Sequence, residues 1–170
     1  EYEDALRELA DIMAAKGFHV VAAGAFIGEH SYSTHRQPVA ANRPDEADLE
    51  KARAFGRAVK DKLLESNPRQ VGVPIPGDVP YREGVVLGQI APETIDEHCV
   101  LCGLCASVCP SFTIQVKDRV VTDVAGCIMC CACVKSCPHE ARVMSHPVVA
   151  ERRTLLAENF NRRREPEWFL

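Results

Sequence analysis

The sequence predicts an α+β fold, with a helix–strand–helix segment followed by a small domain built around a repeated cysteine motif. Helical apolar patterns occupy the first part of the chain. A proline- and glycine-rich stretch follows them, and eight of the nine cysteines then fall into two copies of one spacing. With 170 residues, 46% hydrophobic and 26% charged, the composition is that of a globular protein of one or two domains.

Residues 1–16 are expected to form an amphipathic helix, because Leu6, Leu9 and Met13 recur on one face at helical spacing. The apolar run 18–23 follows. It has the pattern of a short strand buried on both faces, as in a parallel sheet.

A second helix is predicted to begin after Pro44 and to end before Pro68. Asp45 or Asp48 is expected to cap it, because a carboxylate accepts hydrogen bonds from the free N–H groups of the first turn. Gly56 lies on its apolar face and is expected to allow close approach of a neighbouring element.

The polar loop between these elements, residues 29–43, leaves the carboxyl end of the predicted strand, which is where ligands bind in open α/β sheets. The Tyr32 ring could stack on a planar group, and Ser31 or His30 could hydrogen-bond it. The alternative is a surface loop whose polar groups satisfy its own backbone.

Residues 71–93 are rich in proline and glycine and cannot form a regular helix. We expect an extended linker along the surface of its neighbours, with a short edge strand at residues 84–87.

The cysteine motif consists of three thiols two residues apart, a fourth three residues later, and a proline directly after it. Three closely spaced thiols can hold three irons of a cubane, whereas the fourth cysteine ligates the other cluster in two-cluster proteins. The motif therefore predicts two [4Fe–4S] clusters with crossed ligation. The first is assigned to Cys99, Cys102, Cys105 and Cys137, and the second to Cys127, Cys130, Cys133 and Cys109.

Other uses of these thiols fit less well. A zinc site would need four thiols from two pairs and would leave the remaining cysteines of each repeat unused. Disulfides do not suit eight thiols at such short spacings in a chain without an export signal. Cys131 aligns with Gly103 of the first repeat, a position that turns the loop, and is expected to be a free thiol.

Short elements are expected around the cysteines. They are a strand at 94–96, a helix at 106–109 and a hairpin formed by 113–116 and 120–122. His139 follows the second Cys-Pro pair and could hydrogen-bond a cluster sulfur; a solvated side chain is the alternative.

Residues 147–170 are expected to begin with a helix and to end on Trp168, Phe169 and Leu170, which are too apolar to remain in water and should pack onto the body. The intervening arginines 162–164 are expected to be solvated.

The composition also limits the expected ligands and the expected cellular location. A net charge of −4 does not indicate nucleic-acid binding, and no apolar run approaches the roughly 20 residues of a membrane span. Oxygen-sensitive clusters without an export signal indicate a cytoplasmic protein.

Several stretches outside the cysteine motif together carry a family resemblance. They are residues 1–6, 17–18, 25–33, 43–45 and 55–56, and the ending 163–170. They resemble the last third of the flavodoxin-like domain, and the C-terminus, of a family of prokaryotic flavodoxin–ferredoxin fusion proteins. The family's phosphate loop for flavin mononucleotide (FMN) is not found in this sequence, so flavin is implied for the full-length family and not expected of this chain.

The resemblance implies a bacterial two-[4Fe–4S] ferredoxin domain preceded by a partial flavodoxin-like α/β segment. The expected boundaries are 1–66 for the flavodoxin-like remnant, 67–93 for the linker, 94–146 for the ferredoxin domain and 147–170 for the helix and tail.

The expected function is one-electron transfer by two clusters, between a flavin site and a redox partner protein such as a flavoprotein or oxidoreductase. The sequence has no arrangement of acid–base or nucleophilic residues that would indicate a stand-alone enzyme. The chain could still be the electron-input part of one. The alternative is a partner-binding module whose clusters are structural.

Overall fold

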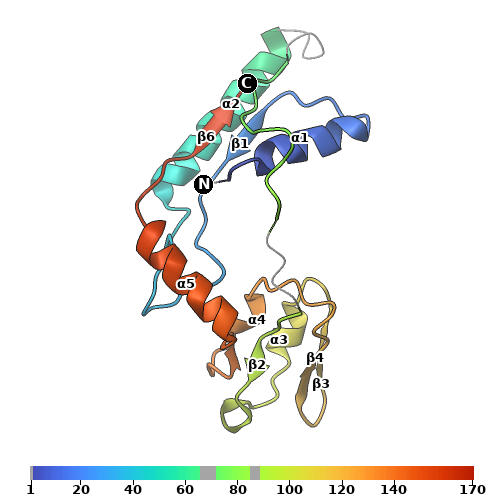
Figure 1. Ribbon diagram of the computed structural model, residues 1–170, viewed down its shortest axis with the longest axis vertical. Helices are drawn as coiled ribbons and strands as arrows, with labels where there is room; N and C mark the ends of the chain where they lie inside the picture. Colours follow the sequence, from blue (N-terminus) through green and yellow to red (C-terminus); the bar gives the residue numbers. More distant parts are fainter. Residues whose placement is uncertain (1, 66–71, 85–88) are drawn as a thin grey trace. The chain divides into compact units, whose positions relative to one another are not determined.

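The computed structural model describes residues 2–65, 72–84 and 89–170 and divides the chain into two compact units (Figure 1). Unit 1 comprises Glu1–Glu29, Asn42–Val85 and Arg163–Leu170, and unit 2 comprises His30–Ala41 and Val86–Arg162. Each unit therefore contains segments that are distant in sequence. The predicted edge strand at 84–87 lies mostly outside the described residues.

Unit 1 contains two helices and a two-stranded antiparallel sheet. Its elements are α1 (Ala5–Ala15), β1 (Ala23–Ala25), α2 (Glu46–Glu65) and β6 (Glu167–Phe169), and Gly24 of β1 pairs with Trp168 of β6. Both helices are where the apolar periodicity predicted them.

The prediction of a buried parallel strand at 18–23 is wrong. The strand begins at Ala23, and its partner β6 runs antiparallel to it. Phe18 is 60% exposed. An apolar run indicates burial but carries no information about which strand lies beside it, and here the partner comes from the other end of the chain.

The C-terminal residues pack onto unit 1, as expected. The Trp168 ring lies 6.0 Å from the Phe55 ring of α2, and the Phe55 ring lies 5.9 Å from Phe26. Gly56, by contrast, does not mediate a close approach, because a Cβ there would meet no heavy atom within 4 Å.

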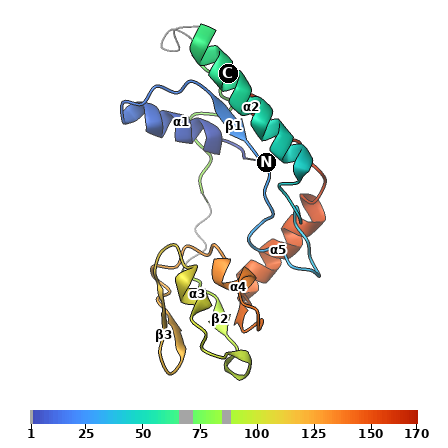
Figure 2. The same cartoon turned by 180° about the vertical axis from the view of Figure 1, so that it is seen from behind.

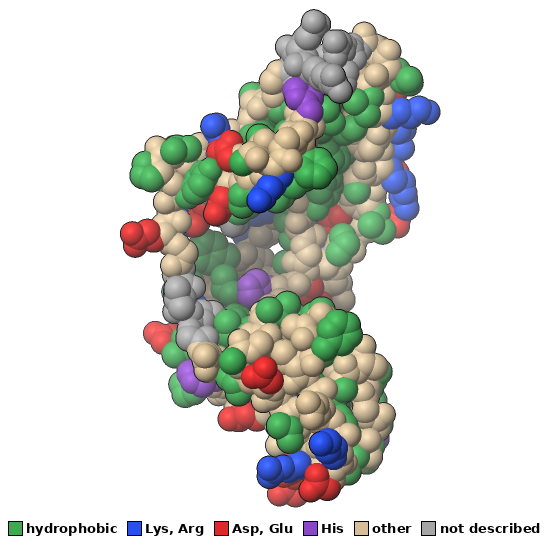
Figure 3. Space-filling view, turned by 90° about the vertical axis from the view of Figure 1, so that its right-hand side faces the viewer, with side chains coloured by type: hydrophobic (Ala, Val, Ile, Leu, Met, Phe, Trp, Pro, Cys, Tyr) green, Lys and Arg blue, Asp and Glu red, His purple; other side chains and the backbone are tan. Residues whose placement is uncertain are grey.

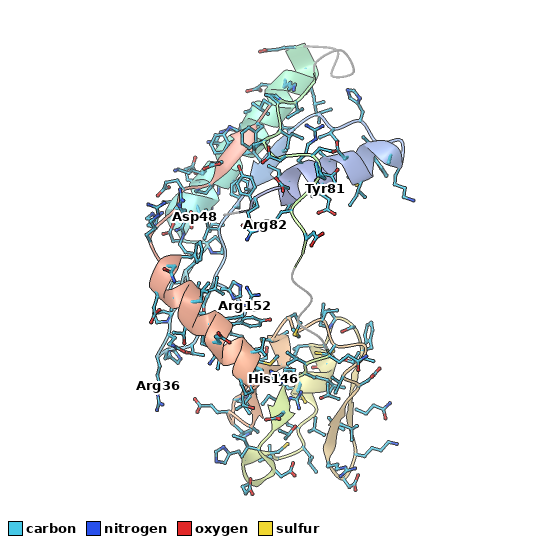
Figure 4. The ribbon with its side chains drawn as sticks, in the orientation of Figure 1. Arg36, Asp48, Tyr81, Arg82, His146 and Arg152 are labelled. Atoms are coloured by element: carbon cyan, nitrogen blue, oxygen red, sulfur yellow. The ribbon has the colours of Figure 1, made fainter. Side chains whose placement is uncertain are left out.

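The start of α2 is held by a buried ion pair. The Asp45 carboxylate accepts from the Asp48 N–H at 3.0 Å and caps the helix, as predicted, while Asp48 accepts from the Asp45 N–H at 2.8 Å. Asp48 is 1% exposed and also accepts two hydrogen bonds from the Arg43 guanidinium (Figure 4). Arg163 is exposed, as expected, and also pairs with Asp45 at 2.6 Å.

The proline-rich segment of unit 1 lies along α1. Tyr81 donates its hydroxyl proton to Asp11 at 2.8 Å, and the Arg82 N–H donates to Asp4 at 2.8 Å (Figure 4). These contacts satisfy polar groups of an extended chain that forms no helix of its own.

Unit 2 is a small α+β arrangement of short elements (Figure 2). They are β2 (Glu93–Thr94), the 3₁₀ helix η1 (Asp96–His98), α3 (Leu104–Ser107), β3 (Ile114–Val116), β4 (Val120–Thr122), α4 (Ala132–Lys135), β5 (Arg142–Val143) and α5 (Pro147–Asn159). Strand β2 pairs with β5, and β3 with β4, both antiparallel. The predicted hairpin is confirmed.

The loop 30–41 also belongs to unit 2 and is tied to it by side-chain and backbone contacts. Lys135 donates to the Ser33 carbonyl at 3.0 Å, and Arg153 of α5 donates to the Tyr32 carbonyl at 2.8 Å. Gln37 donates to Thr154 at 2.8 Å. The loop is therefore packed against the cysteine-bearing part of the chain.

No helix among the described residues is long and apolar enough to cross a membrane.

Candidate iron–sulfur site

Two hollows in unit 2 are each lined by four cysteines of the motif. The first is lined by Cys99, Cys102, Cys105 and Cys137, and the second by Cys109, Cys127, Cys130 and Cys133, with the ninth cysteine, Cys131, also in its lining. They enclose about 340 and about 300 Å³ of space not filled by protein atoms, part of it open to solvent. Each hollow thus takes three thiols from one repeat and the fourth from the other.

The backbone repeats along with the cysteines. Leu101 and Gly103 in the first loop, and Met129 and Cys131 in the second, all have positive φ, between 54° and 78°. Turns of this kind direct successive N–H groups into one concavity, an arrangement found at many anion and iron–sulfur sites. The same sequence spacing therefore builds the same cradle twice.

Cys131 occupies the turning position that Gly103 occupies in the first repeat, as predicted. Its φ is 57°, and its side chain is 2% exposed, packed with Ile90, Met144 and Val149. Burial raises the pKa of the Cys131 thiol to about 11. The residue is therefore a neutral core thiol, and no disulfide involves any of the nine cysteines, all of which are described.

The residues fit a cubane better than a single ion. Among residues 2–65, 72–84 and 89–170, no group of three or more His, Cys, Asp or Glu side chains is placed to hold one metal ion. In a cubane each thiolate binds a different iron, so the four sulfurs stand farther apart than around one zinc. The thiols also differ in exposure, since Cys102 and Cys130 are exposed whereas Cys105 and Cys133 are buried.

Cys109 has polar neighbours that favour its thiolate. Its Sγ lies 3.3 Å from the Thr113 hydroxyl and 3.8 Å from the Ser111 hydroxyl. Hydrogen bonding by Thr113 is the main cause that lowers the pKa of Cys109, to about 7. A ligand must be deprotonated, so this environment suits metal binding.

Apolar side chains reach the surface close to the cysteines. Val100 is 60% exposed beside the first hollow, which it lines, and Ile128 is 63% exposed beside the second. Phe112 is 87% exposed, three residues after Cys109. Hydrophobic side chains also lie open on the face shown in Figure 3. We call Val100, Phe112 and Ile128 the apolar rim.

The structure places the three predicted loop residues on unit 2. The Tyr32 hydroxyl lies 4.0 Å from the Met129 sulfur and the ring packs against the core that contains Cys131. The His30 ring lies 5.0 Å from the Tyr32 ring, and His30 Nδ1 accepts from the Tyr32 N–H at 3.1 Å. Ser31 lies between them and is half-buried. His139 lines the first hollow.

One residue of the site was missed by the sequence reasoning. Arg142 lines the first hollow, is 3% exposed, and its Nη2 lies 3.9 Å from the Cys133 sulfur, which belongs to the second hollow. The signal was available, because Ile114 stands at the corresponding position of the first repeat and an arginine is unusual where an apolar residue is buried.

Comparison with known proteins agrees with this geometry. A family profile described as a 4Fe-4S dicluster domain matches residues 91–143. A curated relative, the NADH-quinone oxidoreductase subunit I of Pelobacter propionicus, is 36% identical over 62 residues, an alignment that covers 28% of this chain and 33% of the relative. The chain thus spans about a third of the length of that relative. No solved structure matches.

The matched region contains all eight cysteines of the motif, and it is the ferredoxin-type part of the chain. Neither comparison shows a flavodoxin-like segment in residues 1–66. The chain carries a 4Fe-4S dicluster domain of ferredoxin type, and these findings support [4Fe–4S] clusters as its cofactors and an electron-transfer role.

Proposed function

We propose that the protein is a one-electron carrier whose two clusters are ligated crosswise. Cys99, Cys102, Cys105 and Cys137 hold cluster 1, and Cys127, Cys130, Cys133 and Cys109 hold cluster 2. The observation that carries the proposal is the lining of the two hollows, each with three cysteines of one repeat and one of the other. When bound, each cubane takes up and releases one electron.

The protein's part in this chemistry is to hold and shield the clusters. Cys105 and Cys133 are buried, and Ile114, Val116 and Val120 pack around the cysteines that separate the hollows. Apolar packing of this kind limits water and thereby influences the potential, together with hydrogen bonds to sulfur. No proton transfer by a side chain is required.

Single cysteine substitutions test the crossed ligation. Cys137→Ser should remove or weaken cluster 1, although residue 137 lies in the second repeat, and Cys109→Ser should do the same to cluster 2. Cys131→Gly, which reproduces Gly103 of the first repeat, should keep both clusters. Iron and acid-labile sulfide are measured in anaerobically purified protein, and the two clusters are distinguished by electron paramagnetic resonance (EPR). If Cys137→Ser instead affected only cluster 2, the assignment would be overturned.

We further propose that the chain passes electrons to or from other proteins, as part of an oxidoreductase or beside one. Support comes from the similarity to an oxidoreductase subunit and from the exposure of Val100 and Ile128, which line the hollows and leave apolar surface there for a partner to cover. A flavoprotein or another oxidoreductase is the expected redox partner, in a reducing compartment such as the cytoplasm.

The alternative function is partner binding with purely structural clusters. The two functions differ in the response to dithionite: a carrier shows reversible loss of visible absorbance, whereas structural clusters resist reduction until the protein unfolds.

The resemblance to flavodoxin–ferredoxin fusions supports a proposal for the polar loop. In that reading Tyr32, Ser31 and His30 contact a flavin or a flavin-bearing partner near cluster 2, and residues 1–66 are a flavodoxin-like remnant. The test is the binding of added FMN to the purified protein, followed by quenching of flavin fluorescence. Saturable quenching that is lost in Tyr32→Ala supports the proposal, and no quenching rejects flavin binding by this chain.

A further inference from the structure

Arg142 is a buried cation that has no carboxylate partner among residues 2–65, 72–84 and 89–170. Its side chain belongs to β5, it is 3% exposed, and none of the ion pairs between described residues includes it. A buried charge is costly unless an opposite charge or several hydrogen bonds compensate it.

The hydrogen bonds present compensate only part of the guanidinium. Nη1 donates to the Thr94 hydroxyl at 2.6 Å, and Nη2 donates to the Pro92 carbonyl and to the Thr122 hydroxyl, both at 2.9 Å. These acceptors are neutral. Nε is buried and has no partner, and it is the only such side-chain nitrogen or oxygen in the described part of the chain.

Arg142 is close to thiols of both hollows. Arg142 lines the hollow of Cys99, Cys102, Cys105 and Cys137. Its Nη2 also reaches the sulfur of Cys133, a residue of the other hollow, at 3.9 Å. The arginine is therefore adjacent to one thiol set and in contact with the other.

Comparison of the two repeats shows that only the second carries a charged residue at this position. Ala141 and Arg142 follow the second Cys-Pro pair at the spacing at which Thr113 and Ile114 follow the first. Ile114 is 8% exposed and packs in the apolar core around the cysteines. The fold therefore accepts an apolar side chain at this position, and burial alone does not require an arginine.

We propose that Arg142 is a counter-ion shared by the two clusters and that it raises their reduction potentials. Its Nη2, whose two N–H groups donate to Pro92 and Thr122, lies 3.9 Å from the Cys133 sulfur of cluster 2 and acts there through its charge. The unpartnered Nε–H supplies a donor for a sulfur of cluster 1. This inference rests on the proposed ligation.

The physical reason is the charge that reduction adds. A cubane with four thiolates is anionic, and uptake of one electron from an external reductant makes it more negative by one charge. A fixed positive charge in a dry site stabilises the reduced form more than the oxidised form.

Potentiometric titration with EPR detection tests the proposal. Arg142→Gln, which removes the charge and keeps hydrogen-bond donors, should lower the reduction equilibrium constant of at least one cluster tenfold or more, equal to 59 mV for a one-electron couple. Arg142→Lys should fall between Gln and wild type. Arg119→Gln removes an exposed charge from the β3–β4 turn and should change the constant less than twofold. If the reduction equilibrium constants of both clusters in Arg142→Gln stayed within twofold of wild type, the proposal would be overturned.

Isotope labelling gives a readout that a purely structural role would not affect. Reduced protein containing arginine labelled with ¹⁵N in the guanidinium alone should show a weak ¹⁵N hyperfine coupling to a cluster, absent from Arg142→Ile, the variant that copies Ile114. If Arg142→Ile loses its clusters, the Arg142→Lys protein serves as the comparison. In that variant the coupling should be absent with ¹⁵N-arginine and present with ¹⁵N-lysine. Absence of coupling in wild type with both clusters present would contradict direct contact, whereas altered cluster content in wild type would contradict the ligation instead.

Discussion

Val149 offers a quantitative test of how unit 2 supports its clusters. The residue lies in the first turn of α5, is completely buried, and packs with Ile90, Cys131 and Met144. Cys131 also lines the second hollow, so this small core borders the site proposed for cluster 2.

The expected cost of Val149→Ala follows from the volume removed. Loss of two methyl-sized groups costs about 1.6 kcal/mol at about 0.8 kcal/mol each, and the cavity left behind brings the total to about 2 kcal/mol or slightly more. For a domain of this size about 1 kcal/mol shifts the thermal midpoint by roughly 4–8 °C. A decrease of roughly 8–16 °C is therefore expected.

The assay is anaerobic thermal denaturation followed by the visible absorbance of the clusters. Because cluster loss is irreversible, all proteins are compared at one scan rate. Val148→Ala is the matched control, since the neighbouring valine is 39% exposed and the same groups are removed there. Equal midpoints for the two variants would refute the view that α5 forms part of the core that supports the clusters.

Further predictions concern both units. Asp48→Asn should lower the urea midpoint of unit 1, followed by Trp168 fluorescence, because the substitution leaves the Arg43 charge buried without its closest carboxylate. The cluster absorbance transition should stay unchanged, and a shift of both transitions would contradict this. The Arg43 hydrogen bond lowers the pKa of Asp48 below its ordinary 3.8, so the stabilisation is complete above that value and should be lost as pH falls through the lower folded-state pKa, with less pH dependence in Asp48→Asn. Burial, and next the charge of Lys135, lower the pKa of His30 below 6.5, so unit 2 should lose stability as pH falls below 6.5, where the unfolded chain takes up the proton. His30→Asn keeps an acceptor for the Tyr32 N–H and should reduce this dependence of the thermal midpoint between pH 7.5 and 5.5; an unchanged dependence would exclude His30 as its cause.

The cysteine spacing predicted which thiols of the motif line each hollow, because three of the four lie on one short loop whose geometry is local. The hairpin around residue 118 was predictable for the same reason, since its strands are adjacent in sequence. The alignment of the two repeats also identified Cys131 as a turning residue.

Features that depend on distant contacts were not predictable. The partner of β1 is β6, at the opposite end of the chain, and nothing in the run 18–23 specifies it. Likewise, residues 30–41 look like an ordinary polar loop, and only their contacts with Lys135, Arg153 and Met129 assign them to the cysteine-bearing unit. Arg142 was visible in the sequence, but its lack of a carboxylate partner is a property of the folded structure.

The central claim is that two cross-ligated cubanes carry electrons. Its most direct test is coulometric reduction of anaerobically purified protein, with the electrons taken up and returned counted against iron content. The account predicts two electrons per chain, reversibly, with about eight irons and eight sulfides. Full iron content without reversible electron uptake would contradict electron transfer and leave the clusters a structural role.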